Sequence, residues 1–298
     1  MQQLAVKKKK IKLEPILDFI GFVGPAMILF TLFFTYPLFQ GVMLSFTNWD
    51  GFGVADFIGT ANYSRLFRDQ AFQASIMRTF YIAGFNVFFT NILAMTFAVA
   101  LTTKFKLNNL IRAVIFLPTM ISMVISGFIW KFMFNEISQT MYEFFGLAFL
   151  DQSWLGNPDI VLNSIVIVSV WQGMGYVMTI YIAGLIGVDE SVVEAARIDG
   201  ATSWQVFFRI KLPLMLPVVT VGAFLNLTGS LRMFDTIFSL TGGGPGTASE
   251  VAMLNVYREA FVSSNFGYGS TKAVVLSLII IVLTVIQLRL TSGKEVDH

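Results

Sequence analysis

Residues 189–217 read DESVVEAARIDGATSWQVFFRIKLPLMLP and lie between two long apolar runs of the chain. Ser191 and Glu194 have the S-x-x-E spacing of a capping box, in which each side chain binds the free backbone N–H of the other residue at the start of a helix. Gly200 follows, and glycine most easily adopts the left-handed conformation that closes a helix. This pattern predicts a short capped helix that ends at a glycine turn.

A second helix is expected directly after this turn. Thr202 and Gln205 repeat the spacing of a capping box, and Pro213 should interrupt the helix because proline has no backbone N–H. The stretch is therefore predicted to fold as a helix, a one-glycine turn and a second helix. Such a module between two membrane spans is suited to a partner at the membrane surface.

The composition is that of a membrane protein. Charged residues make up only 13% of the 298 residues and hydrophobic residues 55%, whereas soluble domains carry about 25% charged residues. The mean hydropathy is +0.72. The apolar runs are continuous rather than alternating, which indicates helical spans and not the strands of a barrel. We therefore predict an all-α polytopic membrane protein.

Several functional classes are disfavoured by residues that the chain lacks. It has no cysteine, and its single histidine is the last residue, His298, so thiolate sites, histidine triads and zinc sites are excluded. The net charge of +2 gives no support for nucleic acid as a partner. No G-x-x-x-x-G-K-[ST] motif occurs, so ATP should not bind here. The glycines at 242–244 lack the lysine of that motif and precede Pro245, which predicts a tight external turn. We expect no catalytic residue, metal or cofactor in this chain.

Six apolar runs are long enough to cross a bilayer as helices. The first is too long for a cleaved signal and should kink at Pro25 and Pro37. The predicted spans are residues 19–46, 77–101, 111–134, 160–187, 214–238 and 273–290.

The basic residues predict the orientation of these spans, because cytoplasmic segments are enriched in Lys and Arg. With a cytoplasmic N-terminus, the inner side holds 13 of the 20 Lys and Arg. These are Lys7, Lys8, Lys9, Lys10, Lys12, Lys104, Lys106, Arg112, Arg197, Arg209, Lys211, Arg289 and Lys294. Both termini are therefore predicted to be cytoplasmic, with tails at 1–18 and 291–298 around a domain at 19–290. The helix–turn–helix module, at about 189–212, would face the cytoplasm between spans four and five.

The segment EAARIDGATSWQVFFRIKLPLMLP, residues 194–217, resembles the EAA motif of the permeases of binding-protein-dependent ATP-binding-cassette (ABC) importers. The residues of this segment are similar to those of sugar-type permeases related to the maltose and glycerol-phosphate systems. The resemblance extends over about residues 22–290. Further matching segments are Leu44-Ser45-Phe46-Thr47-Asn48-Trp49, Leu117-Pro118, Trp130-Lys131, Ala183-Gly184-Leu185, Phe234-Asp235 and Leu240 to Pro245.

This chain departs from the family pattern at one point. Val188-Asp189 stands where the family usually has an Ile-Pro pair before the EAA helix. A proline would fix φ at the start of the helix. Asp189 can instead favour the helix N-terminus through its charge, so we expect the helix to form.

The resemblance implies a permease subunit in the cell membrane of a bacterium or archaeon. It would pair with a second permease and with two ATPase subunits, which bind ATP and Mg²⁺, and an extracytoplasmic binding protein would deliver the sugar. The EAA helix would be the coupling helix that docks into the ATPase. The residues assigned to this coupling are Glu194, Ala195, Ala196, Asp199, Gly200 and Ala201.

Two other interpretations of the module remain open on the residues alone. Ala196, Gly200 and Val206 have the spacing of a DNA-binding helix-turn-helix, although the module lies between two spans and carries few basic residues. A purely structural elbow is the other alternative.

A polar path through the membrane is predicted from spans two, four and five, because polar groups inside a bilayer are costly unless they line a cavity. Ser169, Gln172, Tyr176 and Thr179 share one face of span four. At 1.5 Å per residue, Gln172 and Asn226 lie roughly 18–20 Å from the starts of their spans, near mid-membrane. The candidate substrate-binding residues are Gln172, Tyr176, Asn226 and Asn86. Alternatively, these groups bond to neighbouring helices.

Arg232 and Asp235 lie near the outer end of span five. They could form an ion pair that extends towards the outer surface, or act in the mouth of the path or at the binding-protein contact.

Three alternatives to a sugar permease are compared on the same residues. A permease of the same class could carry another polar solute, such as a glycerol phosphate. An ion-coupled secondary transporter usually has acidic residues inside its spans, and none lies in the middle of a predicted span here. A scaffold protein would not need the capped module.

Overall fold

The computed structural model describes residues 14–103 and 106–292. Within these residues the backbone is helical apart from loops and one isolated bridge between Thr47 and Phe57. The all-α expectation is therefore confirmed. Residues 1–13, which hold the basic cluster Lys7–Lys10 and Lys12, and residues 293–298 of the predicted tails lie outside the described residues.

The helices follow one another in a simple order, and π-helical turns interrupt several of them. The α-helices are α1 Glu14–Phe30, α2 Tyr36–Leu44, α3 Ala61–Leu66, α4 Gln70–Thr102, α5 Asn108–Phe116, α6 Met123–Phe132, α7 Ser138–Phe145, α8 Val161–Ile186, α9 Glu190–Ile198, α10 Ser203–Val206, α11 Leu212–Leu214, α12 Leu216–Leu231, α13 Asp235–Leu240, α14 Ala252–Tyr257 and α15 Phe266–Ser292. The π turns are Thr31–Thr35, Met133–Ile137, Phe207–Lys211 and Arg258–Val262.

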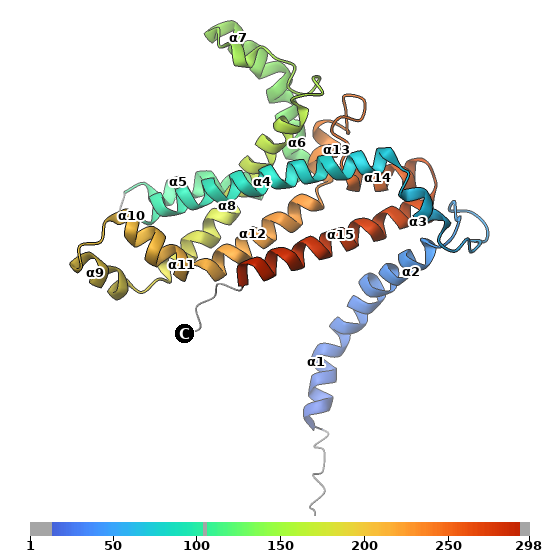
Figure 1. Ribbon diagram of the computed structural model, residues 1–298, viewed down its shortest axis with the longest axis horizontal. Helices are drawn as coiled ribbons and strands as arrows, with labels where there is room; N and C mark the ends of the chain where they lie inside the picture. The colour runs from blue at the N-terminus through green and yellow to red at the C-terminus, as the bar shows by residue number, and fades with distance from the viewer. Residues whose placement is uncertain (1–13, 104–105, 293–298) are drawn as a thin grey trace, which may run out of the picture.

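The centre of the molecule is a bundle in which α4 packs along α8, and α12 packs against both and against α15 (Figure 1). Two arms leave this bundle in different directions. The arm α1–α2 contacts it chiefly through α15, and the arm α6–α7 projects beyond α13 (Figure 1). In the first arm, Gly21–Leu44 buries none of its side chains in this chain.

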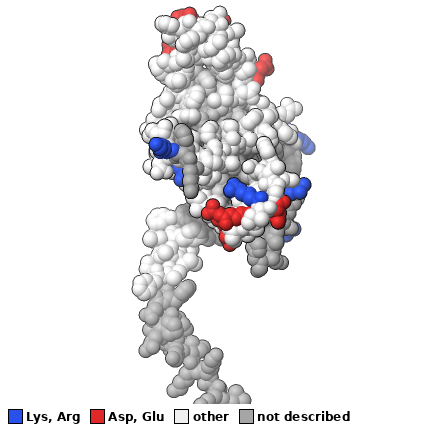
Figure 2. Space-filling model, turned by 90° about the vertical axis from the view of Figure 1, so that its left-hand side faces the viewer, with Lys and Arg blue, Asp and Glu red and all other residues white. Residues whose placement is uncertain are grey.

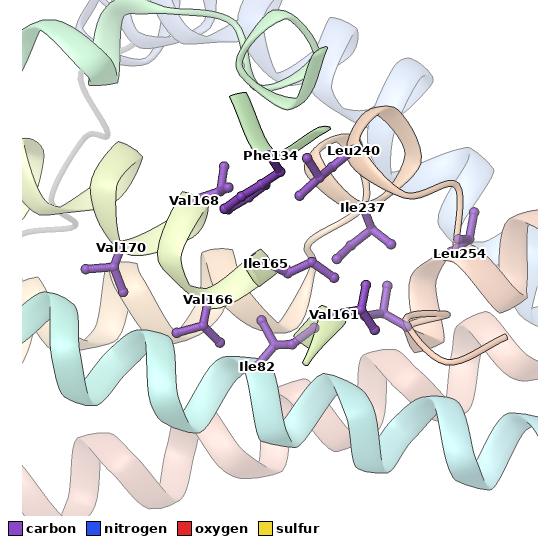
Figure 3. Close-up of a cluster of buried hydrophobic side chains, with 11 residues drawn as sticks. Ile82, Phe134, Val161, Ile165, Val166, Val168, Val170, Ile237, Leu240 and Leu254 are labelled. Atoms are coloured by element: carbon purple, nitrogen blue, oxygen red, sulfur yellow. The ribbon is translucent and has the colours of Figure 1, made fainter. Parts of the chain in front are cut away.

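A buried apolar cluster joins the helices where α4, α8, α13 and α14 meet (Figure 3). Ile82 from α4 faces Val161 and Ile165 from α8, while Ile237 and Leu254 close the cluster from the C-terminal half. Val161, Ile165 and Ile237 are 0% exposed. Because these side chains come from distant parts of the sequence, the cluster holds the two halves of the chain together.

Four helices are long and apolar enough to cross a membrane, and the number rises to six if each of two bent pairs counts as one span. The third predicted span, 111–134, is not one straight helix. The helices Asn108–Met120 and Met123–Phe145 meet at 101°. Pro118 lies in a 3-10 turn before this break, and it lacks the N–H that a continuous helix needs.

The fifth span also differs from its prediction. Ser203–Leu214 and Leu216–Leu231 meet at 70°, and the span ends at Leu231 rather than at residue 238. Pro213 lies inside α11, and the second helix of the module ends one residue later, at Leu214, which agrees with the predicted interruption at Pro213. The π turn Phe207–Lys211 precedes it, and a wider turn accommodates the ring that would clash with the carbonyl four residues earlier in an α-helix.

The two prolines of the first span occupy different positions in its helices. Pro25 lies inside α1, and Pro37 follows the π turn Thr31–Thr35 at the start of α2. Neither position bends Gly21–Leu44 enough to divide the span. The sixth span begins at Phe266 rather than at 273, which places Lys272 inside α15.

Gly175 of α8 allows the backbone of α5 to approach closely. A Cβ at this position would lie 2.3 Å from the carbonyl oxygen of Ile115 and 2.8 Å from the Cα of Phe116. Both atoms belong to the backbone, so neither can move without shifting α5. We therefore expect Gly175→Ala to destabilise the protein by roughly 1–3 kcal/mol, measured as a lower midpoint of thermal unfolding in detergent.

The matched control is Gly84→Ala in α4, where a Cβ would meet nothing within 4 Å. Alanine is the better helix former by about 1 kcal/mol, so this variant should unfold at the same temperature or higher. Equal midpoints for both variants would contradict the close contact.

Candidate functional site

The short helix α9 is capped by Asp189 and not by the predicted capping box of Ser191 and Glu194. Asp189 is the N-cap, and its Oδ1 accepts a hydrogen bond from the backbone N–H of Ser191 at 2.9 Å. The prediction that Ser191 and Glu194 cap each other is wrong, because α9 starts at Glu190 and Ser191 is already helical. The same backbone hydrogen bond lowers the pKa of the Asp189 carboxyl below its usual value.

The predicted glycine turn is confirmed. Gly200 has φ +82°, and its N–H donates to the Arg197 carbonyl at 3.1 Å. The N–H of Ala201 donates to the Ala196 carbonyl at 2.9 Å. This pair of bonds is a Schellman motif, which satisfies the free carbonyls at the end of a helix.

The second capping box, of Thr202 and Gln205, is also confirmed. The backbone N–H of Thr202 donates to Gln205 Oε1 at 2.7 Å, and the backbone N–H of Gln205 donates to Thr202 Oγ1 at 3.4 Å. Both helices of the module are therefore fixed by local bonds that need no partner.

The module α9–α10 lies at one end of the bundle and exposes two large apolar side chains among charged ones. Val193 and Val206 are buried and anchor it, being 5% and 3% exposed. Ile198 and Trp204, which the sequence did not single out, are 86% and 73% exposed. Figure 2 views this end, where acidic and basic side chains lie close together.

The six residues assigned to coupling all lie on this module. Ala196 and Ala201 are half-buried, and the other four are exposed: Glu194, Ala195, Asp199 and Gly200. None of the six is inaccessible to a partner, and their role in coupling stays a prediction.

The four candidate substrate-binding residues, from three helices, surround one cavity. Asn86 belongs to α4, Gln172 and Tyr176 to α8, and Asn226 to α12. All four line a cavity of about 540 Å³. Residues 116–123, at the break between α5 and α6, supply several of its remaining walls. The spacing along single helices could not predict this meeting.

Two of these side chains have polar groups available to a ligand. Asn226 Oδ1 is buried and has no hydrogen-bond partner among the described residues. Tyr176 is 48% exposed. Gln172 is more constrained, because its Nε2 donates to the backbone carbonyl of Ile121 at 3.0 Å.

Asn86 fits the alternative interpretation, in which polar side chains bind neighbouring helices. Its Nδ2 donates to Ser230 Oγ of α12 at 2.8 Å, and its Oδ1 accepts from Thr90 Oγ1 at 3.0 Å. Of the other polar residues on span four, Ser169 lines the cavity. Thr179 is not among the cavity walls, and its Oγ1 donates to the Gly175 carbonyl of its own helix.

Arg232 and Asp235 do not form the ion pair considered from the sequence. Among the described residues no salt bridge joins them. The reason is that α12 ends at Leu231 and α13 begins at Asp235, so the two residues do not share a helix. Both side chains line the same cavity as Asn226 and Gln172.

The chain is similar to known proteins of one family. The family described as "Binding-protein-dependent transport system inner membrane component" matches residues 90–294. The probable starch degradation products transport system permease protein AmyD of Thermoanaerobacterium thermosulfurigenes is 36% identical over 93% of this chain and 94% of its own length. The multiple sugar-binding transport system permease protein MsmF of Streptococcus mutans is 35% identical over 91% and 93%.

Among solved structures, a similar chain belongs to a bacterial alginate ABC transporter in complex with an alginate pentasaccharide-bound periplasmic protein. The TM-score is 0.83 at 20% identity, over 95% of this chain and 96% of that one. At this identity the likeness establishes the fold.

The two hydrogen bonds of the Asn86 side chain lead to a prediction about stability. Asn86→Leu removes the bond to Ser230 and leaves Thr90 without its acceptor, so it should destabilise the protein by roughly 0.6–2 kcal/mol. Thr179→Val, which removes a bond within one helix, is the comparison and should have little effect. Thermal unfolding in detergent measures both, and an unchanged midpoint for Asn86→Leu would contradict the link between α4 and α12.

Proposed function

This chain belongs to the binding-protein-dependent transport system inner membrane components, and from this premise we propose that it forms half of the path of a sugar importer. The resemblance seen in the EAA segment is thereby confirmed. Relatives named for starch degradation products and for multiple sugars support a sugar or oligosaccharide as the solute. The protein is a multi-pass membrane subunit of a transporter and not itself a catalyst.

The meeting of four polar side chains around one cavity carries this proposal. A sugar offers many hydroxyl groups that both donate and accept hydrogen bonds. The unpartnered Oδ1 of Asn226 would accept one of them, which removes the cost of a buried polar atom without a partner. The cavity of about 540 Å³ has the size of small-ligand sites, roughly 300–1,000 Å³.

Energy would enter at the other feature of the chain, the module α9–α10. We infer that the exposed surface of α9, with Ile198 and Trp204 beside it, docks into a groove of an ATPase subunit as a helix-in-groove contact. ATP and Mg²⁺ would bind to two such partner subunits. A second permease would complete the path, and an extracytoplasmic binding protein would deliver the solute, as the binding-protein-dependent class implies.

The orientation proposed for this assembly has six spans, each bent pair counting as one. Both termini and α9 would then lie in the cytoplasm of a bacterial or archaeal cell. The basic residues Arg197, Arg209 and Lys211 on the module support this orientation.

A second solute class has one observation in its favour. Arg232 lines the cavity, and a guanidinium binds phosphate well, so a glycerol phosphate is the alternative. Asp235 in the same cavity disfavours an anion. An ion-coupled transporter is less well supported, because α4, α8, α12 and α15 carry no Asp or Glu.

The sugar path is tested by Asn226→Leu, which replaces the unpartnered amide with an apolar side chain of similar size. Uptake of the solute should fall at least ten-fold, while the variant still assembles with its partner subunits. Thr228→Val on α12, whose hydroxyl bonds within its own helix, serves as the control. Normal uptake by Asn226→Leu would remove this residue from the path.

The coupling proposal is tested by Gly200→Val, because a β-branched residue at φ +82° is strained. The turn should distort, and stimulation of ATP hydrolysis by the loaded binding protein should be lost. Gly187→Ala, at φ −75°, should leave stimulation intact. Co-purification and full stimulation in Gly200→Val would refute the role of the turn.

A further inference from the structure

A buried lysine organises the end of the bundle opposite α9. Lys272 of α15 is only 2% exposed. Its Nζ contacts Glu259 Oε2 at 2.8 Å, Asn255 Oδ1 at 2.9 Å and Asp69 Oδ2 at 3.0 Å. A buried charge is tolerated only when it is paired and hydrogen-bonded. These contacts therefore fix three segments into one surface, and the segment at Asp69 is distant in sequence from the other two.

The two carboxylates of this cluster are already engaged. Asp69 Oδ1 accepts from the backbone N–H of Phe72 at 2.9 Å, and its Oδ2 accepts from the Tyr268 hydroxyl at 2.8 Å. Glu259 Oε1 accepts from Asn265 Nδ2 at 3.0 Å. Burial raises the pKa of the Asp69 carboxyl. The hydrogen bonds that Asp69 accepts and the charge of Lys272 together lower this pKa by more, so it lies below its usual value.

Two arginines beside this cluster are left facing outwards. Arg65 lies over the Tyr268 ring, with 3.8 Å between its Cζ and the ring centroid, and its side chain is 57% exposed. Its one ion pair among the described residues, with Glu259, is long at 3.7 Å. Arg68 is exposed and pairs with no carboxylate among the described residues.

An exposed aromatic residue lies between the arginines. Phe67 is 80% exposed, and its carbonyl accepts a hydrogen bond from Gln73 Nε2 at 2.8 Å, which holds the turn in place. A cavity of about 600 Å³ opens beside it, lined by Arg65, Arg68, Asp69, Asn255, Glu259 and Lys272. Arginine and aromatic side chains are the residues enriched at the centres of protein interfaces.

We propose that Arg65, Phe67 and Arg68, here called the Arg65–Arg68 platform, are a docking surface for a carboxylate-bearing face of the extracytoplasmic binding protein. This inference rests on the proposed function. The platform lies at α3, at the opposite end of the bundle from the α9–α10 module (Figure 1). Guanidinium groups bind carboxylates through two parallel hydrogen bonds, and the internal carboxylates that could compete are held by Lys272, Tyr268 and Phe72.

A protein partner fits this surface better than the transported solute or a lipid does. None of the platform residues lines the cavity that contains Asn226 and Gln172. Six of the seven residues that line the cavity beside the platform are charged or polar, which suits a charged partner better than an acyl chain. An acidic protein surface would satisfy both arginines and cover Phe67.

The test uses the whole importer in nanodiscs and titrates the loaded binding protein while ATP hydrolysis is measured. The double variant Arg65→Glu and Arg68→Glu should raise the half-maximal concentration of binding protein at least ten-fold, with basal hydrolysis unchanged. Arg68→Glu alone, which breaks no ion pair of the described residues, should raise it at least three-fold. The effect should shrink with added salt, because exposed charge pairs are screened.

Two controls separate charge from folding. Arg65→Lys with Arg68→Lys keeps both charges and should raise the half-maximal concentration less than five-fold. Lys131→Glu reverses an exposed charge on the arm α6–α7, away from α3 (Figure 1), and should change nothing.

Each remaining outcome overturns the proposal. An unchanged half-maximal concentration in the glutamate variants would place docking elsewhere. The wild type is also measured in nanodiscs without phosphatidylglycerol. If its half-maximal concentration of binding protein rises there as much as in the glutamate variants, the platform is a lipid site instead. If no loaded binding protein stimulates even the wild type, the proposed function fails as well, and the wild-type titration alone shows it.

Discussion

The hydrogen bond from Gln172 to the carbonyl of Ile121 satisfies a backbone group that no helix satisfies, and this need constrains the whole molecule. Inside a bilayer, each backbone group without a partner costs several kcal/mol, and non-helical backbone survives only where protein or a cavity surrounds it. The break between α5 and α6 exposes such backbone at residues 121–122. An amide side chain of α8 satisfies one of the exposed carbonyls, so the break is fixed from the helix that packs beside it.

The cavity is a consequence of the same requirement. Two spans stop being helical, at 121–122 and at 215, and the second bend redirects α12 along α4 and α8. Straight helices with Leu and Val contacts would fill this space completely. Broken ones leave a gap that Asn226, Tyr176 and Ser169 line with polar atoms. Glycine takes part as well, because Gly175 lets α5 lie directly against α8 before the break.

Local signals in the sequence predicted the parts of the fold that local forces determine. Continuous apolar runs predicted helices, Gly200 the left-handed turn and Thr202 with Gln205 the second capping box, since each depends on residues within one turn. The first cap is different, because Ser191 and Asp189 are both residue types that cap helices. The pattern alone favours Ser191, since Glu194 follows it by three residues. The structure shows that Asp189 is the cap, because α9 starts at Glu190. Pro118 gave a visible signal for the break in the third span, in a segment that hydropathy alone treats as continuous.

Contacts between distant segments were beyond local reasoning. The polar face of span four indicated Gln172 and Tyr176, but its meeting with Asn226 depends on how α8 and α12 pack. The predicted sixth span begins at residue 273 and so leaves Lys272 just outside it, whereas α15 begins at Phe266. The partners of Lys272, Asp69 and Glu259, come from two other segments, and nothing in the sequence around residue 272 indicates them.

The bent helices stand next to two that are unbroken, and this difference has a mechanical meaning. Helix α4 has 33 residues, a length of about 50 Å against a hydrocarbon core of about 30 Å. It starts at Asp69, beside the buried lysine, and ends at the turn where Arg112 donates to the Leu101 carbonyl at 2.6 Å. Helix α8 runs alongside it and leads within four residues into α9. Two continuous helices can carry a displacement from one end of the bundle to the other, whereas the two bent spans beside them are the points at which the bundle can flex.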